Sequence, residues 1–237
     1  MYYKSYKFRL YPSDIQEKTI NKTFETKRFI YNYFLSLIIE NYSGQYENMR
    51  YYQNHVKHKH DFLRYVDDNF VKKILQDLDK NYMKACKDKK FILRFKSKND
   101  RISYGINSHS DMELNLKSKT ITLPILGVVK VRGYKNIDSI NGKIMSVTIS
   151  KELNGKYYIS VLYLMNEKLS RVKPNSIVGS DLGVKNLLTL SDGTVYENSR
   201  SILKYEKRIN RMQKTLSRKV KGSENYKKCK QKLAVLH

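Results

Sequence analysis

The stretch that decides the fold runs from residue 177 to residue 195 and reads Ile-Val-Gly-Ser-Asp-Leu-Gly-Val-Lys-Asn-Leu-Leu-Thr-Leu-Ser-Asp-Gly-Thr-Val. Its apolar beginning predicts a short strand, and Asp181 is the first acidic residue that follows. Residues 187–190 predict a second strand, and the Ser-Asp-Gly sequence at 191–193 predicts a tight turn into a third strand at 194–196. We therefore expect Asp181 at the end of a central strand, immediately before a hairpin.

A carboxylate in this position suggests a metal site. Mg²⁺ prefers hard oxygen ligands, and RNase H-like nucleases place the first ligand of a catalytic metal pair at such a strand end. Gly183 would let the backbone turn close to the bound group. Two other interpretations stay open: the phosphate-binding hairpin of actin-like and sugar-kinase ATPases, and a surface aspartate in an ordinary turn. The ATPases need two such domains and more chain than these 237 residues.

Residues 178–193 resemble the first RuvC motif of the TnpB family, also called OrfB, the transposon-encoded RNA-guided nucleases related to type V CRISPR effectors. Segments similar to the family precede it in the family's order, at residues 7–12, 28–32, 123–131 and 142–150. The resemblance covers the chain from end to end. It implies that Asp181 is a catalytic residue and a Mg²⁺ ligand. It also implies two partners, a guide RNA from the transposon end and a double-stranded DNA target.

The chain carries a large excess of positive charge: 47 Lys and Arg against 22 Asp and Glu, a formal net charge of +25. Such a charge opposes compaction unless a polyanion neutralises it, so nucleic acid is the first expected partner and an acidic membrane surface the alternative. Twenty tyrosines and no tryptophan, interleaved with cations, suit base stacking beside phosphate contacts. No apolar run reaches the roughly 18 residues of a membrane span, and no signal-peptide core begins the chain. We expect a cytoplasmic, nucleoid-associated protein of a bacterium or archaeon, without a membrane partner.

Cysteine and histidine positions give little support for a zinc site. Cys86 and Cys229 lie far apart within helical patterns, which favours a reducing cytoplasm over a disulfide framework. The chain has no Cys-x-x-Cys pair, so it cannot form a zinc ribbon alone. His55, His58 and His60 have only Asp61 as a nearby further ligand. A solvated or phosphate-facing segment is the favoured interpretation.

Two amphipathic helices are predicted in the segment 13–98. Ser13 and Gln16 form a capping box, so the first helix begins there, and the second runs from about 67 to 89. Their apolar stripes predict the core of a small helical bundle. A basic run with interleaved aromatic residues follows, and its predicted nucleic-acid contacts are Lys84, Lys87, Arg94 and Lys96.

Strand patterns dominate residues 101–165. Lys117-Ser118 predicts one hairpin turn, and Asn154-Gly155 predicts a type I′ hairpin turn. About five strands, together with a strand at 3–11, favour a small closed or nearly closed barrel. The resemblance implies that residues 1–12 and 99–170 form the family's wedge-type barrel, with residues 13–98 as its inserted recognition lobe.

The last segment, 174–237, is expected to be the N-terminal part of a RuvC-like domain. A helix at 201–216 is interrupted by Gly222, and an apolar stripe then continues to the end. This pattern predicts a helical hairpin with a basic outer face, and its predicted phosphate contacts are Arg208, Arg211, Lys214 and Arg218. The last stripe has no stop signal, and no later acidic residue matches the second or third RuvC motif. The chain is therefore expected to be truncated.

Together, the sequence predicts an α+β protein: a wedge-type barrel with an inserted helical bundle, then the start of an RNase H-like domain with a basic helical hairpin. Its predicted function is RNA-guided DNA binding. Because only the first catalytic carboxylate is present, this chain is expected not to cleave DNA. Two alternatives remain: a fragment of an active Mg²⁺-dependent RNA-guided endonuclease, and an unguided basic nucleic-acid-binding module. Oligomeric state is not predicted.

Overall fold

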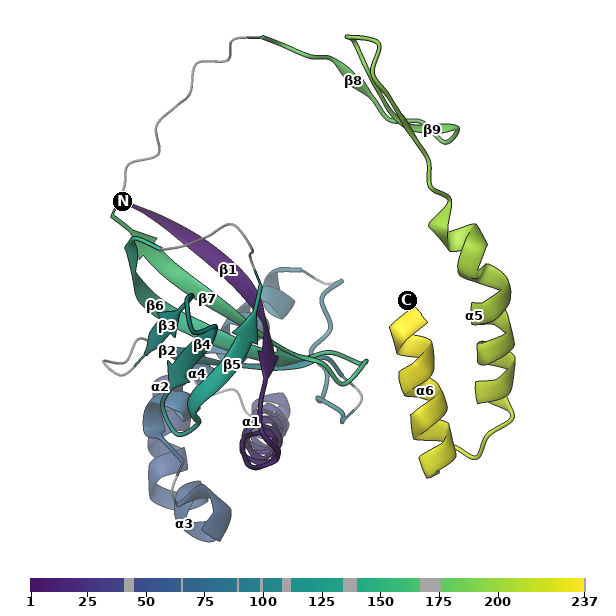
Figure 1. Ribbon diagram of the computed structural model, residues 1–237. Helices are drawn as coiled ribbons and strands as arrows, with labels where there is room; N and C mark the ends of the chain where they lie inside the picture. Colours follow the sequence, from purple (N-terminus) through teal and green to yellow (C-terminus); the bar gives the residue numbers. More distant parts are fainter. Residues whose placement is uncertain are drawn as a thin grey trace. The chain divides into compact units, whose positions relative to one another are not determined.

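The computed structural model has an α+β architecture, with one large antiparallel sheet and helices (Figure 1). It divides into two compact units, Met1–Lys168 and Leu169–His237, which we describe separately. The residues that the structure describes are 1–40, 45–64, 66–88, 90–98, 100–107, 112–133, 140–166 and 176–236.

The first unit is built on a seven-stranded sheet with the strand order β2-β6-β7-β1-β5-β4-β3. Its strands are β1 (Tyr2–Tyr11), β2 (Ile102–Asn107), β3 (Glu113–Asn115), β4 (Thr120–Leu123), β5 (Gly127–Arg132), β6 (Gly142–Lys151) and β7 (Tyr157–Met165). The five strands expected after residue 101 are present, and β2 is an additional one. Among the described residues β2 and β3 are the two edges, so the strand ladder itself is open.

Strict alternation of apolar and polar residues gives the sheet one buried face. In β1 the side chains of Tyr6, Phe8 and Leu10 are buried, while the residues between them face outward. In β7 every second residue from Tyr157 onward is buried. The pairing of Phe8 with Ile159 aligns the two buried rows, so the long central strands contribute to a single core.

The helices of the first unit lie between β1 and β2 in the chain. They are α1 (Asp14–Glu40), α2 (Gln45–Tyr51), the π-helical turn η1 (Tyr52–Val56), α3 (Lys57–Lys59), the 3₁₀ turn η2 (Asp61–Leu63) and α4 (Asp68–Lys87). The predicted capping box begins α1: the Ser13 N–H donates to Gln16 Oε1 at 2.9 Å, and the Gln16 N–H donates to Ser13 Oγ at 3.4 Å. The side chain of Asp67 caps α4 by accepting from the Phe70 N–H.

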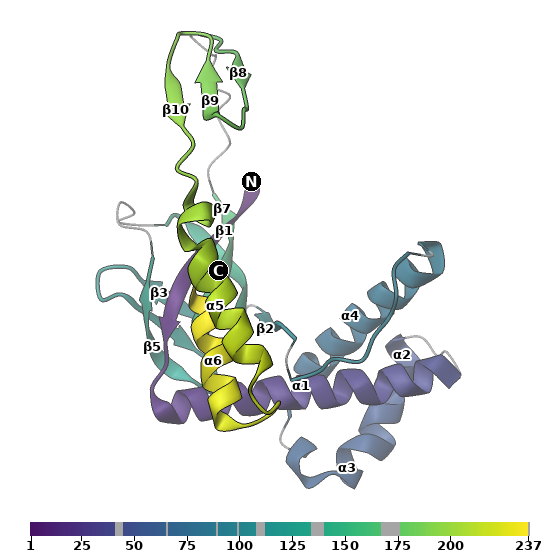
Figure 2. The same ribbon diagram turned by 90° about the vertical axis from the view of Figure 1, so that its right-hand side faces the viewer.

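Helix α1 belongs to two cores, which the sequence did not predict. Near its start, Ile20 and Phe24 pack in the sheet core. Further along, Ile30, Phe34 and other buried residues form a second core with α2, η1 and α4. The prediction that the whole stripe lies in a helical bundle was therefore wrong for Ile20 and Phe24, in the first three turns. Figure 2 shows α1 as one continuous rod that passes from the sheet to the other helices.

Both predicted hairpins of the sheet are present, but one turn type was wrong. β6 and β7 pair through a loop in which the Gly155 N–H donates to the Glu152 carbonyl and Gly155 has φ 79°. Asn154 is not among the described residues with positive φ, as a type I′ turn would require. The loop is instead a three-residue connection with glycine in the left-handed position. The β3–β4 hairpin turns at residues 116–119.

The second unit contains a small sheet of order β10-β9-β8, formed by β8 (Ser180–Asp181), β9 (Asn186–Leu190) and β10 (Val195–Glu197). All its pairings are antiparallel. The three predicted strands are present, but the expectation that Asp181 ends a central strand is wrong for the described residues. β8 is an edge strand there, because its only described ladder is to β9.

Helices α5 (Ser201–Ser217) and α6 (Glu224–Leu236) form the predicted helical hairpin. Gly222, with φ 89°, lies in the connection between the two helices. Ser223 then caps α6 by accepting from the Tyr226 N–H at 3.1 Å. Cys229 is buried at the seam, and its Sγ lies 4.0 Å from the Met212 carbonyl oxygen.

Candidate nucleic-acid interface

The basic segment after α4 is fixed to α1 by one side chain. The Asn32 amide donates to the Lys96 carbonyl at 2.9 Å and accepts from the Lys96 N–H at 2.7 Å. The same segment closes on itself where the Ser97 N–H donates to Asp100 at 2.8 Å. Because both backbone groups of Lys96 are hydrogen-bonded to Asn32, the backbone of the basic segment is fixed beside α1.

A pocket of about 330 Å³ lies where this segment meets α1 and α4. Five cationic side chains line it, and only two carboxylates do. Its residues are Lys27, Arg28 and Tyr31 of α1, Asp77, Lys80 and Asn81 of α4, and Lys96, Ser97, Asp100, Arg101, Ile102 and Ser103. We call it the basic pocket. It brings together charges from three separate parts of the sequence.

One of the lysines that line the basic pocket is largely buried. Lys27 Nζ donates to the Ser103 carbonyl at 3.0 Å and so joins α1 to β2. Burial lowers the pKa of Lys27, and the charges of Lys96 and Lys73 lower it further, against an opposing effect of Asp77. The charge of Lys27 therefore interacts with the charges of the residues around it, including Asp77 and Lys96 of the pocket.

Carboxylates neutralise the cations of the pocket only in part: Arg28 pairs with Glu25 at 3.9 Å and Arg101 pairs with Glu152 at 3.4 Å. Asp100 accepts from the Ser97 N–H, which lowers the pKa of its carboxyl group, and it lies 3.7 Å from the Arg94 guanidinium. Among the described residues, no carboxylate forms an ion pair with Lys27, Lys80 or Lys96. The pocket therefore presents a net positive charge in a partly enclosed space, where Coulomb interactions are stronger than in open water.

The predicted contacts near α4 surround this pocket unequally. Lys96 lines it, with Nζ 5.3 Å from the centre of the Tyr31 ring. Arg94 does not line the pocket, but it forms an ion pair with Asp100, which does. Lys84 lies with its Nζ 4.5 Å from the Phe91 ring centre, and Lys87 is the last residue of α4. Both lysines are exposed but do not line the pocket.

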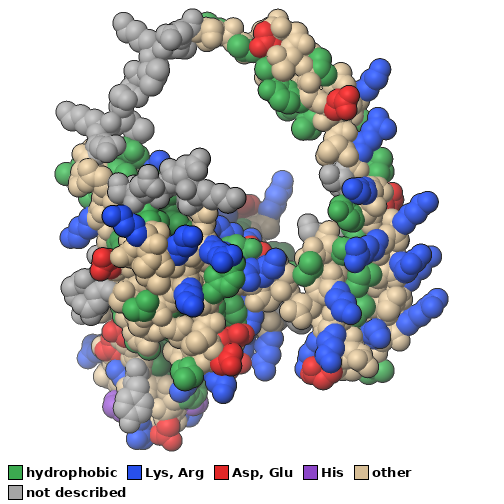
Figure 3. All heavy atoms as spheres, viewed as in Figure 1, with side chains coloured by type: hydrophobic (Ala, Val, Ile, Leu, Met, Phe, Trp, Pro, Cys, Tyr) green, Lys and Arg blue, Asp and Glu red, His purple; other side chains and the backbone are tan. Residues whose placement is uncertain are grey.

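The second unit carries a separate basic surface. Arg208, Arg211, Lys214 and Arg218 are exposed and recur every three or four residues, which places them along one side of α5 and the turn after it. Ile209, Met212 and Leu216 of α5 are partly buried instead, and the Met212 carbonyl oxygen lies 4.0 Å from Cys229 Sγ of α6. Figure 3 shows Lys and Arg side chains projecting along this hairpin.

Asp181 is exposed at the edge of the small sheet, paired in register with Thr189. Gly183 has no positive φ; a Cβ there would meet the Asn186 carbonyl oxygen at 3.0 Å. The glycine is therefore explained by the tight β8–β9 connection, and it needs no bound group. Among the described residues of its own unit, Asp181 forms no hydrogen bond or ion pair with another predicted site residue.

The other acidic side chains of this unit include two with local partners. Asp192 accepts from the Thr194 N–H at 2.8 Å, which lowers the pKa of Asp192. Glu224 pairs with Lys227 at 2.6 Å, which lowers the pKa of Glu224. Within the described ranges, no group of three or more His, Cys, Asp or Glu side chains is placed to hold a metal ion.

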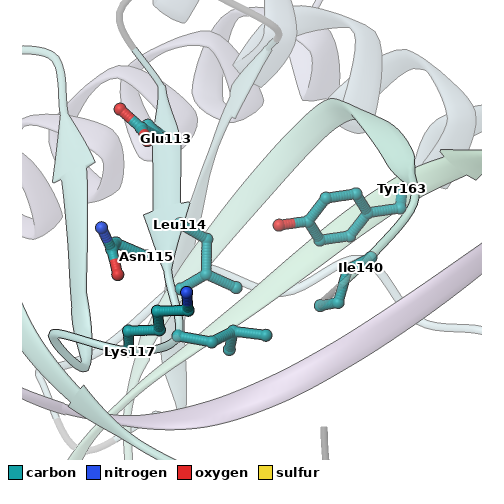
Figure 4. Close-up of a pocket in the computed structure, with 7 residues that line it drawn as sticks. Glu113, Leu114, Asn115, Lys117, Ile140 and Tyr163 are labelled. Atoms are coloured by element: carbon teal, nitrogen blue, oxygen red, sulfur yellow. The ribbon is translucent and has the colours of Figure 1, made fainter. Parts of the chain in front are cut away.

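A second cavity, of about 280 Å³, lies on the inner side of the large sheet near its β3 edge. It is lined by Glu113, Leu114, Asn115, Leu116, Lys117, Ile140 and Tyr163. In Figure 4 the Tyr163 hydroxyl points from β7 toward Leu114 of β3. Burial raises the pKa of Tyr163 to about 12. With one carboxylate and one lysine, this cavity lacks the charge imbalance of the basic pocket.

Several pocket residues were not predicted as site residues from the sequence, namely Lys27, Arg28, Lys80 and Arg101. The adjacent pair at 27 and 28 stands in the middle of an otherwise apolar helical stripe, which was a usable signal. Lys80 gave none, because an exposed lysine on a helix is ordinary. No described helix is both long enough and apolar enough to cross a membrane.

Lys27 provides a test of the pocket's burial. The unfolded chain binds the lysine proton more tightly than the folded chain does, because the folded pKa lies below the ordinary 10.5. The charge therefore costs stability at neutral pH, and this cost disappears as the pH rises toward 10.5. We expect the free energy of unfolding of Lys27→Met, relative to wild type, to fall as the pH rises toward 10.5 in urea titrations. Lys18→Met, on the exposed side of α1, should show no such trend; equal trends would contradict the burial.

Comparison with protein families gives two matches. Residues 160–237 match the OrfB family model described as "Probable transposase", and residues 1–45 match an OrfB model described as "Helix-turn-helix domain". Within residues 1–40, which the structure describes, the second match corresponds to β1 and the single helix α1.

Two curated relatives match nearly the whole chain. "Putative RNA-guided DNA endonuclease InsQ" of Escherichia coli (strain K12) is 32% identical over 99% of this chain and 58% of its own length. A protein of the same description from Streptomyces pristinaespiralis is 24% identical over 99% of this chain and 59% of its own length. The chain thus spans less than two thirds of either relative. A solved Cas12f1–sgRNA–target DNA complex matches with a TM-score of 0.43 and 10% identity, over 99% of this chain and 74% of that chain. The family matches and the curated relatives show that the chain belongs to the TnpB (OrfB) family.

Proposed function

We propose that these 237 residues form the nucleic-acid-binding part of an RNA-guided DNA-binding protein. The observation that carries the proposal is the basic pocket, in which five cations face two carboxylates. The descriptions of the two relatives as RNA-guided DNA endonucleases support the guided form of this function. The guide RNA would supply sequence recognition by base pairing, and the protein would hold backbones and read a short neighbouring motif in the DNA.

The pocket suits a phosphodiester backbone better than it suits a small metabolite. Lys80 of α4 and Lys96 of the following segment both line it, and Lys96 lies over the Tyr31 ring. A bound phosphate would be attracted by Lys80 and Lys96, which form no ion pair with a described carboxylate. It would also favour the charged form of Lys27, whose pKa is lowered in its absence.

We propose the following division of the chain. Residues 1–12 and 99–170 form the wedge-type barrel, and residues 13–98 form the recognition lobe inserted after β1. The large sheet supports a barrel-like closure, because Leu114 of β3 and Tyr163 of β7 line one cavity although three strands separate β3 from β7. Residues 174–237 form the N-terminal part of a RuvC-like domain, with β8–β10 as its first strands.

The described residues do not fit a complete two-metal site. Such a site needs several carboxylates within a few ångströms of one another, and Asp181 has no described acidic partner of this kind. We infer that Asp181 is one Mg²⁺ ligand of the intact family site. We infer further that this chain, tested as it stands, binds nucleic acid without cutting it.

The cleavage prediction is tested with the purified chain, its co-purified RNA, Mg²⁺ and a matching DNA target. Wild type and Asp181→Ala should both leave the DNA uncut. Asp192→Ala is the matched control, since this carboxylate serves only the β9–β10 turn. Mg²⁺-dependent cutting that persists in the control and disappears in Asp181→Ala would refute the inferred incompetence.

The guided function predicts which RNA accompanies the protein. After expression with its native flanking DNA and a high-salt wash, the chain should retain one discrete RNA species, identified by sequencing. An unguided basic module would instead carry heterogeneous nucleic acid that salt removes, because its affinity would come from counterion release alone. Recovery of such a mixture would decide for the unguided alternative.

The basic surface on α5 is tested by its salt dependence. The variant with Gln at positions 208, 211, 214 and 218 should bind duplex DNA more weakly. Its plot of log affinity against log salt should flatten by about 0.9 for each phosphate that the variant no longer neutralises. Glutamine preserves the helix. A charge-matched control places Gln at 185, 221, 228 and 232 of the same unit. Equal flattening in both variants would show that only net charge matters.

A further inference from the structure

A further cationic surface lies on the outer face of the large sheet, and Glu152, which contacts both Lys7 of this surface and Arg101 of the basic pocket, connects the two. The alternation that buries Phe8 turns Lys7, Arg9 and Tyr11 outward. Arg9 pairs in register with Tyr158 of β7 on one side and with Arg132 of β5 on the other. We call Lys7, Arg9, Tyr11, Arg132 and Tyr158 the tyrosine–arginine face.

These five side chains form a continuous row in which cations and rings alternate. Lys7 Nζ lies 4.5 Å from the centre of the Tyr158 ring. The Arg9 guanidinium carbon lies 5.3 Å from the Tyr158 ring centre and 5.3 Å from that of Tyr11, so it sits between the two rings. The Arg132 guanidinium carbon lies 5.9 Å from the Tyr11 ring centre. Contacts of this kind hold the guanidinium planes in defined positions.

The charges of this row are not balanced. Arg9 and Arg132 are direct cross-strand neighbours, and like charges in that arrangement destabilise a sheet. Among the described residues, no carboxylate forms an ion pair with either arginine. Glu152, 3.4 Å from Lys7, is shared with Arg101 at the same distance. Arg9 Nε is buried and has no hydrogen-bond partner among described groups. An anion at this face would relieve the repulsion between Arg9 and Arg132.

The exposed ring decides which kind of anion fits. Tyr11 is 46% exposed beside the two arginines. A duplex keeps its bases stacked inside, whereas a single strand can lay an unpaired base on a ring while its phosphates meet nearby cations. An acidic peptide would match the charge but make no use of the ring.

We propose that the tyrosine–arginine face binds a single-stranded segment of nucleic acid. Its phosphates lie against Arg9 and Arg132, and one unpaired base stacks on Tyr11. The inference rests on the proposed nucleic-acid function but concerns different residues from those that line the basic pocket, and it assigns them to unpaired nucleotides.

The test measures the affinity of the full chain for fluorescein-labelled U12 RNA and for a 12-base-pair RNA duplex by anisotropy. Tyr11→Leu should weaken U12 binding by about fivefold to 100-fold, the range expected for losing one stacked base, and should change duplex binding less than about twofold. Tyr11→Phe should bind U12 as wild type does. Arg132→Gln, at an exposed position, should weaken U12 binding and flatten its salt dependence by about 0.7.

The charge-matched control for Arg132→Gln is Lys143→Gln, an exposed lysine elsewhere on the sheet, which should leave U12 binding within about twofold of wild type. The proposal is overturned by unchanged U12 affinity in Tyr11→Leu, by equal losses for U12 and duplex, or by poly-glutamate displacing U12 as well as unlabelled U12 does. If Tyr11→Leu fails to fold, the Arg132→Gln and Lys143→Gln pair decides alone. Failure of the proposed function has a different signature: no discrete RNA is retained, whatever these variants do.

Discussion

Cations exceed carboxylates by 25 in this chain, and the fold has to accommodate that excess without enough acidic partners. Several of the cations lie over aromatic rings: Lys84 lies over Phe91, Lys96 over Tyr31 and Lys7 over Tyr158. Such contacts fix where a cation points, but they leave its charge in place. The surfaces that result are ordered and remain positively charged, which is the condition under which binding a polyanion is favourable.

Local signals predicted much of the fold. The capping box at Ser13, the interruption at Gly222 and the hairpins at residues 117–118 and 154–155 each depend on a few neighbouring residues, and the structure contains all of them. The strand β2 was missed, although Ile102, Tyr104 and Ile106 alternate with polar residues, because it is short and lies next to the basic run. The turn at Gly155 was given the wrong type, since the same Asn-Gly pair serves both kinds of hairpin.

Features that depend on distant residues were not predictable in the same way. The division of α1 between two cores follows from where the sheet ends, which the apolar stripe does not reveal. The basic pocket requires the Asn32 clamp on Lys96, a contact across 64 residues, and its Lys80 looks like any surface lysine. The role given to Asp181 came from family resemblance; the described geometry adds only that it is exposed on an edge strand.

The length of α1 has a mechanical consequence. Its 27 residues make a rod about 40 Å long, anchored in the sheet core at one end and in the helical core at the other. A helix resists bending far more than a loop of the same length does, so α1 forms a stiff connection between the two cores. The length of α1 therefore sets the separation of the two cores, and a displacement of the helix at one core would be transmitted to the other.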